Sequence, residues 1–275
     1  MRHLAVKTAI AALLAGSTGT AALASSMAAL APHRAVYDLE LKDASDRSGI
    51  KQLTGRMVYE FNGSVCDGFT TTFRYVTKID NGEAQRLTDQ QTTTFESGDG
   101  KNFEFLTKNF VYKTMDKETR GKAHVTDKGL EVEVTKPVEA KHELDKSFFP
   151  TTHLVDLLTR AESGEKFYET KIFDGTEDAD RTLTTTVIVG DKNKAASEGE
   201  DKDAAASLNK ADYFPVSISY FDPESETGEE MPVYQIGFKL YQNGITRDLQ
   251  MDYGDFKLSG KLVDLKLYDR PDCSQ

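Results

Sequence analysis

The sequence predicts a fold dominated by antiparallel β-strands, with one short helix packed against the sheet. Apolar and polar residues alternate with a period of two through most of the chain, which is typical of strands with one buried face. The strand-like segments follow one another without helical spacers, which favours antiparallel pairing. One segment alone has the spacing of an amphipathic helix. From the number of alternating segments we expect about 12 to 14 strands.

The alternation is clearest in three segments, Ala35–Leu41, Phe69–Tyr75 and Leu130–Val134. In each of them apolar, aromatic or threonine side chains take every second position, so one face of the strand is expected to be buried. Further strands are predicted at Gly55–Phe61, Arg86–Phe95, Asn102–Tyr112, Glu118–Val125, Lys166–Phe173, Arg181–Gly190 and Tyr213–Phe221, with a marginal one at Lys141–Leu144.

Three strands near the C-terminus are predicted to form a meander. They cover Pro232–Gln242, Ile245–Tyr253 and Phe256–Leu267. Asn243 and Gly244 separate the first two strands. An Asn-Gly pair is preferred in a type I′ turn, because both of its residues need a positive φ. We therefore expect a tight hairpin of this type.

One helix is predicted between Phe149 and Ala161. Its apolar residues recur at i, i+3, i+4 and i+7, as Leu154, Leu157, Leu158 and Ala161. Threonines are placed to cap its start, and Gly164 is placed to end it. A helix of roughly 11 residues is too short to be stable alone. Its apolar face is therefore expected to pack on the inner surface of a curved sheet.

The N-terminus has the layout of a secretory signal peptide. Basic residues precede a short apolar run, Thr8–Leu14, and small residues continue to an A-x-A site at Ala22–Ala24. We predict a signal peptide over residues 1–24, with cleavage near Ala28 as the alternative. The apolar run is far shorter than the roughly 20 residues of a membrane-spanning helix, and no later segment approaches that length. The exported chain is therefore not expected to be an integral membrane protein.

Removal of the signal peptide makes the chain more acidic. The full sequence has a formal charge of −11. The signal peptide carries two basic residues, Arg2 and Lys7, and no acidic one, so the charge of the mature chain becomes −13. Such an excess repels phosphate groups, so nucleic acid and anionic membrane surfaces are not expected as partners.

Two cysteines, Cys66 and Cys273, are the whole cysteine content. In an exported chain an isolated pair is expected to form a disulfide, because the compartment is oxidising. A catalytic Cys66 thiolate is the alternative, and it leaves Cys273 without a role. On the loop-entropy model, a bond that spans so much of the chain stabilises it by up to about 5 kcal/mol. It also favours one cooperative domain over two independent ones.

The expected mature unit is therefore a single domain over residues 25–275. Within it, Asp191–Asp212 is rich in charged residues and alanine and has almost no large apolar residue. Such a composition buries too little surface to offset the entropy of ordering, so we predict a flexible acidic insert. The insert divides the strands into two groups, but the expected disulfide crosses it.

No motif identifies a reaction, a cofactor or a metal. Each histidine of the mature chain is expected at the surface or on a strand, because nothing near it completes a ligand set; they are His33, His124, His142 and His153. Asp174–Asp180 gathers four carboxylates but lacks the frame of a calcium loop, so a solvated turn is favoured. The nucleophile-elbow, Walker A and dinucleotide-binding sequences are absent. We predict no catalytic residue, no cofactor and no metal ligand.

Four segments resemble a known family. They are His33–Leu39, Gly55–Phe69, the helix start Phe149–Thr151 and the closing Leu267–Cys273. Together they are similar to the EipB-type periplasmic cell-envelope integrity proteins of α-proteobacteria, long described as a domain of unknown function. The likeness runs over essentially the whole mature chain and includes a cysteine near each end.

This resemblance implies a periplasmic protein whose strands form an open, spiral-like barrel around the helix. It also implies a disulfide from an early strand to the C-terminus, which assigns the bond to Cys66 and Cys273. The role of the family is to maintain envelope integrity under stress, without an established catalytic activity. The chain is accordingly not expected to be an enzyme.

Three molecular functions fit these expectations. The first is a scaffold that binds another periplasmic or envelope protein, through a free sheet edge or an exposed surface. The second is a carrier that holds an amphiphile, such as a lipid or a lipoprotein acyl chain, in the concave face of the sheet. The third is an envelope hydrolase in which two of the many carboxylates converge in space. A filled core with an exposed patch would support the scaffold, and an unfilled apolar cavity would support the carrier. A cleft that holds carboxylates of raised pKa would support the hydrolase.

Overall fold

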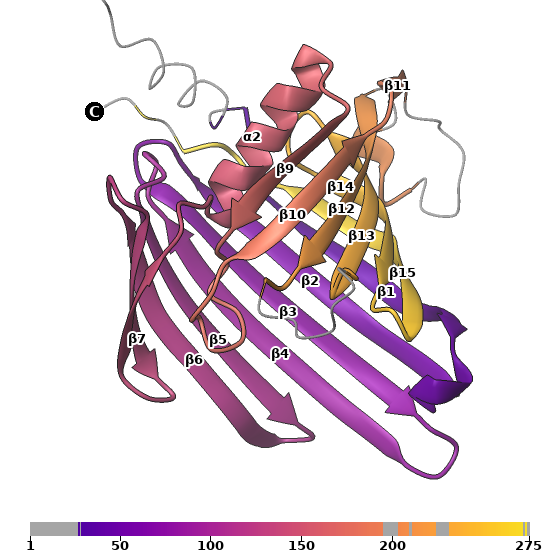
Figure 1. Cartoon of the computed structure of the whole chain (residues 1–275). Helices are drawn as coiled ribbons and strands as arrows, with labels where there is room; N and C mark the ends of the chain where they lie inside the picture. The colour runs from indigo at the N-terminus through magenta and orange to yellow at the C-terminus, as the bar shows by residue number, and fades with distance from the viewer. Residues whose placement is uncertain are drawn as a thin grey trace, which may run out of the picture.

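The computed structural model describes residues 27, 29–194, 203–208, 211–223, 231–271 and 273, so the predicted signal peptide lies outside the described residues. Fifteen strands form one antiparallel sheet, accompanied by a single described α-helix, α2 (Pro150–Ser163). The sheet curves around the helix without closing (Figure 1). The predicted fold class is confirmed.

The strands before the helix are β1 (His33–Ala44), β2 (Gln52–Ser64), β3 (Gly68–Asp80), β4 (Gln85–Glu96), β5 (Asn102–Val111), β6 (Thr114–Val125), β7 (Leu130–Lys136) and β8 (Ala140–Leu144). Those after it are β9 (Phe167–Ile172), β10 (Leu183–Val189), β11 (Asn193–Lys194), β12 (Asp212–Phe221), β13 (Tyr234–Tyr241), β14 (Thr246–Asp252) and β15 (Phe256–Leu267). Every predicted strand is present. The two-residue strand β11 was not predicted, because two residues carry no alternation.

The order of the strands explains why the sheet is one body. From one edge to the other it is β8-β7-β6-β5-β4-β3-β2-β1-β15-β14-β13-β12-β10-β9, with β11 beside β12. Two meanders therefore meet at the seam between β1 and β15, which runs from His33 opposite Leu267 to Ala44 opposite Phe256 with two register shifts along the way. Helix α2 connects the two edge strands, β8 and β9. Between them, Phe148 forms a single bridge with Ile172.

The disulfide links parts of a chain whose sheet is already continuous. Cys66 lies in the turn between β2 and β3, and Cys273 lies in the tail beyond β15. The bond therefore attaches the tail to a turn of a sheet that is already continuous through β1 and β15. Backbone hydrogen bonds between β1 and β15 and between β10 and β12 already join the strands on either side of the insert, so the continuity of the sheet does not depend on the disulfide.

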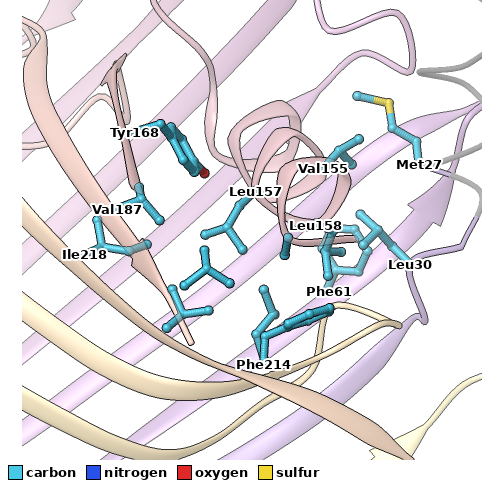
Figure 2. Packing of buried hydrophobic residues seen from close by; sticks show 14 of the residues in the cluster. Met27, Leu30, Phe61, Val155, Leu157, Leu158, Tyr168, Val187, Phe214 and Ile218 are labelled. Carbon is cyan, nitrogen blue, oxygen red and sulfur yellow. The ribbon is translucent and has the colours of Figure 1, made fainter. Parts of the chain in front are cut away.

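Helix α2 packs as predicted, with its apolar face on the inner surface of the sheet. Val155, Leu157, Leu158 and Ala161 are buried in a cluster with residues from both meanders (Figure 2). Phe61 comes from β2, whereas Phe214 comes from β12. The helix therefore fills the space between the two halves of the curved sheet.

The predicted capping of the helix needs correction. Phe149 occupies the N-cap position, and Thr152 Oγ1 accepts from the backbone N–H of Phe149 and donates to the carbonyl of the same residue. The first free N–H groups of the helix, those of Thr151 and Thr152, instead donate to the Glu96 carboxylate at the end of β4. A tertiary contact replaces the local cap. Gly164 ends the helix as predicted, with a φ of 86°.

The hairpin between β13 and β14 is present, but its turn is not of type I′. Gly244 has a φ of 85°, whereas Asn243 is not among the residues with a positive φ. The Gly244 N–H donates to the Tyr241 carbonyl, and the Tyr241 N–H donates to the Ile245 carbonyl. This pattern is that of a three-residue loop whose last residue is left-handed, which requires glycine only at that position.

Parts of the acidic insert are built into the fold. Asn193 and Lys194 form β11, and a short 3-10 turn, η2 (Ala206–Leu208), follows. Ala205 and Leu208 are fully buried, and Leu208 packs with Tyr241 and Ile245. The flexibility of the insert stays a prediction, but residues 193–194 and 206–208 form regular structure. Residues 195–202 and 209–210 of the insert lie outside the described part of the chain.

Candidate functional site

The inner face next to α2 is filled with protein side chains. Leu157 and Leu158 pack with apolar residues from the sheet. Met27 and Leu30, which precede β1 in the chain, belong to the same cluster (Figure 2). Met27 is fully buried, and Leu30 is nearly so. A second cluster, beside the helix start, contains Phe103, Phe105, Phe149 and Phe173, with ring centroids between 4.9 and 6.4 Å apart. The helix end of the inner face is therefore a packed core.

Glu96 is the buried acid of this core. Its side chain is 2% exposed, and its two carboxylate oxygens accept hydrogen bonds of 2.7 and 2.9 Å from the N–H groups of Thr151 and Thr152. Burial raises the pKa of Glu96, whereas these hydrogen bonds act in the opposite direction. The positive end of the helix dipole favours the ionised form at this position. With both oxygens occupied by backbone donors, Glu96 anchors the helix.

Two of the four histidines are buried rather than exposed. His153 lies on α2, and its Nε2 has no hydrogen-bond partner among the described residues. Burial lowers its pKa to about 4. His33 is buried at the start of β1, where Nδ1 lies 2.7 Å from the Ala31 carbonyl, and burial lowers its pKa as well. The prediction of a surface or strand position holds for His33, His124 and His142, which lie on β1, β6 and β8. It was wrong for His153, because the helix turns that side chain into the core.

The described residues contain no group of three or more His, Cys, Asp or Glu side chains that is arranged to hold a metal ion. The four histidines lie on separate elements, β1, β6, β8 and α2. In the acidic segment, Asp174 accepts bonds from the N–H and hydroxyl of Thr176, while Asp178 pairs with Lys117. These carboxylates therefore have protein partners.

The far end of the inner face carries a strip of half-buried aromatic side chains. The hydroxyls of Tyr75 and Tyr253 lie 3.4 Å apart, and the Tyr253 ring lies 4.9 Å from that of Tyr234 and 4.7 Å from that of Phe256. Burial raises the pKa of Tyr75 and Tyr234 well above the ordinary value. The strip offers flat apolar rings with hydroxyl groups, which is the chemistry that an amphiphile would need. Sequence alternation does not show that β3, β13 and the β14–β15 turn come together in space.

The sulfurs of Cys66 and Cys273 are bonded, with their Cα atoms 5.8 Å apart. Beside the bond is a small cavity of about 180 Å³, lined among others by Met27, Val65 and Arg270. The Arg270 guanidinium donates to the Ala29 carbonyl over 2.7 Å. The disulfide therefore stands where the N-terminal segment, the β2–β3 turn and the C-terminal tail meet.

The outer face of the edge strand β9 and of its neighbour β10 exposes two large apolar side chains. Phe167 is 64% exposed, and Ile188, its direct cross-strand partner on β10, is 54% exposed. The Val189 N–H donates to the Lys166 carbonyl, so the bonds between β9 and β10 involve every second residue from Lys166. The backbone groups of Phe167 and Glu169 consequently point to the free edge. We call Phe167, Ile188 and this part of the edge the β9 surface.

A shallow groove of about 600 Å³ lies on the outer face over β3 to β7. Phe95 and Leu106 form its apolar part, and Arg120 and Lys122 line one side. Both cations already have acidic neighbours: Lys122 lies 2.9 Å from Glu133, and Arg120 lies 3.7 Å from Glu118. The two cations are therefore compensated, whereas the Glu104 carboxylate, which also lines the groove, forms no ion pair among the described residues.

Among the described residues, no helix is both long and apolar enough to cross a membrane.

Comparison with known proteins relates the chain to a family, to a curated relative and to a solved structure. A model of the EipB-like family matches residues 24–269. The chain is 53% identical over 256 residues to the cell envelope integrity protein EipB of Brucella abortus, with 93% of this chain and 90% of that protein covered. It is also similar to the crystal structure of a β-barrel-like protein of a domain of unknown function from Brucella abortus. That match has a TM-score of 0.84 and 52% identity, and it covers 87% of this chain and 99% of the other.

Proposed function

This chain belongs to the EipB-like family, and from that premise we propose that it is a periplasmic, non-enzymatic protein that supports envelope integrity by binding a protein partner. The relative from Brucella abortus is named for cell envelope integrity, which supports the general role. The molecular part of the proposal depends on the β9 surface. An edge strand with free backbone groups and exposed apolar neighbours is the arrangement to which another protein adds a strand.

The distribution of apolar side chains supports a partner over a ligand. The inner face is filled by α2 at one end, so large apolar groups are buried there among protein atoms. Phe167 and Ile188, in contrast, lie on the outer face and are more than half exposed. An extended partner segment beside β9 would accept hydrogen bonds from the backbone of Phe167 and Glu169 and cover the Phe167 ring. Apolar contact and backbone pairing would then act together.

Photo-crosslinking in the periplasm tests this proposal. The photoreactive residue p-benzoylphenylalanine is placed at Phe167 or at Ile188, with Val138 as the matched control. Val138 is also an exposed apolar residue, but it lies in the turn between β7 and β8. We expect one discrete protein adduct from Phe167 and Ile188 and none from Val138. The same adducts from all three positions, or none from any, would contradict the proposal.

The carrier remains a second candidate because of the aromatic strip formed by Tyr75, Tyr234, Tyr253 and Phe256. A carrier would be isolated with an amphiphile against these rings. The hydrolase has no comparable support. Glu96 is the buried carboxylate with a raised pKa, and its oxygens are engaged by Thr151 and Thr152 rather than directed into a cleft.

A further inference from the structure

We propose that the outer-face end of the β3–β4 and β5–β6 hairpins adsorbs to an anionic lipid bilayer. The surface in question is formed by four side chains, Leu87, Phe110, Tyr112 and Met115, and three lysines around them. We call it the hairpin surface. It is separate from the β9 surface, and the proposal does not depend on the partner described above.

The register of the strands brings the four apolar side chains together. Met115 lies directly opposite Phe110, and the Tyr112 N–H donates to the Leu87 carbonyl over 2.8 Å. Thr88 faces inward opposite Thr77, with which it shares a hydroxyl contact, so Leu87 faces outward by alternation. Tyr112 and Met115 are both more than half exposed, and Leu87 is exposed as well. Exposed apolar side chains gathered at a hairpin end indicate a contact with another phase or molecule, although the Asp89–Arg74 pair lies beside Phe110 on the same face.

Three lysines, Lys78, Lys108 and Lys113, surround these residues. Lys78 lies directly opposite Leu87, Lys108 lies two residues before Phe110 on the same face, and Lys113 follows Tyr112 at the turn. Within the described part of the chain, no ion pair joins any of the three to an acid. They are therefore available to phosphate groups of lipid headgroups.

The acids on the same strands are mostly occupied. Asp89 forms two hydrogen bonds with Arg74, and the Asp80 carboxylate accepts from Gly82 and Gln85 within its turn. Glu118 lies opposite Lys108 and near Arg120. Asp116 is the exposed acid beside Met115. Locally, Asp89 and Glu118 have cationic neighbours. Asp116, and Glu83 in the β3–β4 turn, are exposed acids that form no ion pair among the described residues.

The position of this surface suits contact with a plane. Figure 1 shows the β3–β4 and β5–β6 turns at the end of the sheet that lies away from α2, where they extend beyond the rest of the strands. Apolar side chains that enter the interface by a few ångströms, together with basic residues at headgroup level, are the two elements of peripheral membrane binding. The net charge of the chain opposes approach from a distance, but screening limits that repulsion to roughly 8 Å at physiological ionic strength.

The net charge of the whole chain argued against contact with anionic membranes, but the apolar side chains and lysines of the hairpin surface favour such a contact locally. A lipid surface, rather than an acidic protein, is the occupant that matches an apolar centre of about four side chains ringed by separate lysines, because headgroups supply phosphates at every lateral position. A folded acidic partner would have to match the spacing of the three lysines.

The absence of tryptophan from the sequence makes a direct test possible. The variant Y112W carries one indole in the hairpin surface, and I188W carries one in the exposed part of the β9 surface. Both are mixed with phosphatidylcholine vesicles, with or without one quarter phosphatidylglycerol. We expect a blue shift of indole fluorescence for Y112W with the anionic vesicles alone, and no shift for I188W. A shift for neither variant, or the same shift for both, would overturn the proposal.

Vesicle flotation of the otherwise unaltered chain gives the second measurement. The variants L87S/M115S and K78E/K108E/K113E are expected to lower the vesicle-bound fraction at least tenfold, whereas F167S/I188S leaves it unchanged. Far-UV circular dichroism and melting temperature verify that each variant is folded. The hairpin variants should leave the Phe167 photo-adduct intact, so a failure of this proposal and a failure of the partner proposal are distinguishable. Equal flotation of wild type and K78E/K108E/K113E would contradict the role of the lysines.

Discussion

Glu96 holds the start of α2 from outside the helix. Its carboxylate accepts hydrogen bonds from the N–H groups of Thr151 and Thr152. Without Glu96 these two N–H groups would be buried without a hydrogen-bond partner. The sequence contains a faint sign of this role, because Glu96 takes an inward position in β4, opposite Phe69 on β3. A charged residue at an inward position is uncommon unless it is paired. Its partner, however, lies 55 residues further along the chain, and no local pattern identifies it.

Replacement of Glu96 by glutamine should destabilise the protein. The amide offers one acceptor oxygen and turns its NH₂ group toward a backbone N–H, so one buried donor loses its partner. We expect the free energy of unfolding to fall by about 1–3 kcal/mol. The exposed Glu104 on the neighbouring strand is the matched control, and its glutamine variant should stay within about 0.5 kcal/mol of wild type. Equal urea midpoints for E96Q and E104Q would show that Glu96 is not an anchor.

His153 should make the protein less stable in acid. Its pKa is about 4 in the folded chain against 6.5 for the free side chain, so the unfolded chain binds more protons between these values. Stability is complete above pH 6.5 and is lost as the pH falls toward 4, by up to about 3 kcal/mol. The lowered pKa of His33 also reduces stability as the pH falls, whereas the raised pKa of Glu96 has the opposite effect on stability.

The variant H153L isolates this contribution, because leucine fills the site without a titratable group. Urea unfolding at pH 7 and at pH 4.5 should show a smaller loss of stability for H153L than for wild type. His124, which is exposed, supplies the control H124L, whose loss should match that of wild type. A wild-type loss no greater than that of H153L would contradict the role of His153.

At the scale of elements, the alternation of residues was sufficient to predict every strand except β11. Alternation reports which face of a strand is buried, and this sheet has an inner face along its whole length. The helix was predicted from its spacing, although it extends to Ser163 and buries Val155 more fully than Leu154. Predictions failed where a single residue or a distant contact decides the structure. The turn at Gly244, the cap by Glu96 and the burial of Leu208 are examples.

Gly244 provides a test of the hairpin geometry. It has a φ of 85°, and a methyl group at its Cβ position would approach Leu30 Cδ2 to 2.8 Å. Gly254, in the turn between β14 and β15, has a similar φ of 82° but no atom within 4 Å of that position. We expect G244A to lower the free energy of unfolding by more than G254A, which loses about 1 kcal/mol through backbone strain alone. Equal losses would mean that the contact with Leu30 is absent.

At the scale of the whole molecule, strand order could not be read from the sequence. The pairing of β1 with β15 joins residues more than 200 positions apart, from His33 and Leu267 onward. Neither strand carries a local sign of its partner, because alternation fixes the buried face and not the neighbour. The seam makes the sheet continuous, and the bond between Cys66 and Cys273 then adds a covalent link to the tail.

The disulfide should stabilise the folded chain without being needed for its architecture. Closure of so long a loop lowers the entropy of the unfolded chain, which corresponds to at most about 5 kcal/mol. The variants C66S and C273S and the double variant should lose the same free energy of unfolding as the reduced wild type. Their far-UV circular dichroism should stay unchanged. Unequal losses between the two single variants would indicate a thiol with chemistry of its own.

We propose that this envelope protein acts by binding a protein rather than by carrying an amphiphile. The filled core around α2 and the exposed Phe167 and Ile188 support the claim, whereas the strip around Tyr253 supports the alternative. Native mass spectrometry of the chain purified from the periplasm tests it most directly. We expect the mass of the disulfide-bonded chain, alone or with a protein partner. A stoichiometric lipid mass that persists through purification would contradict it.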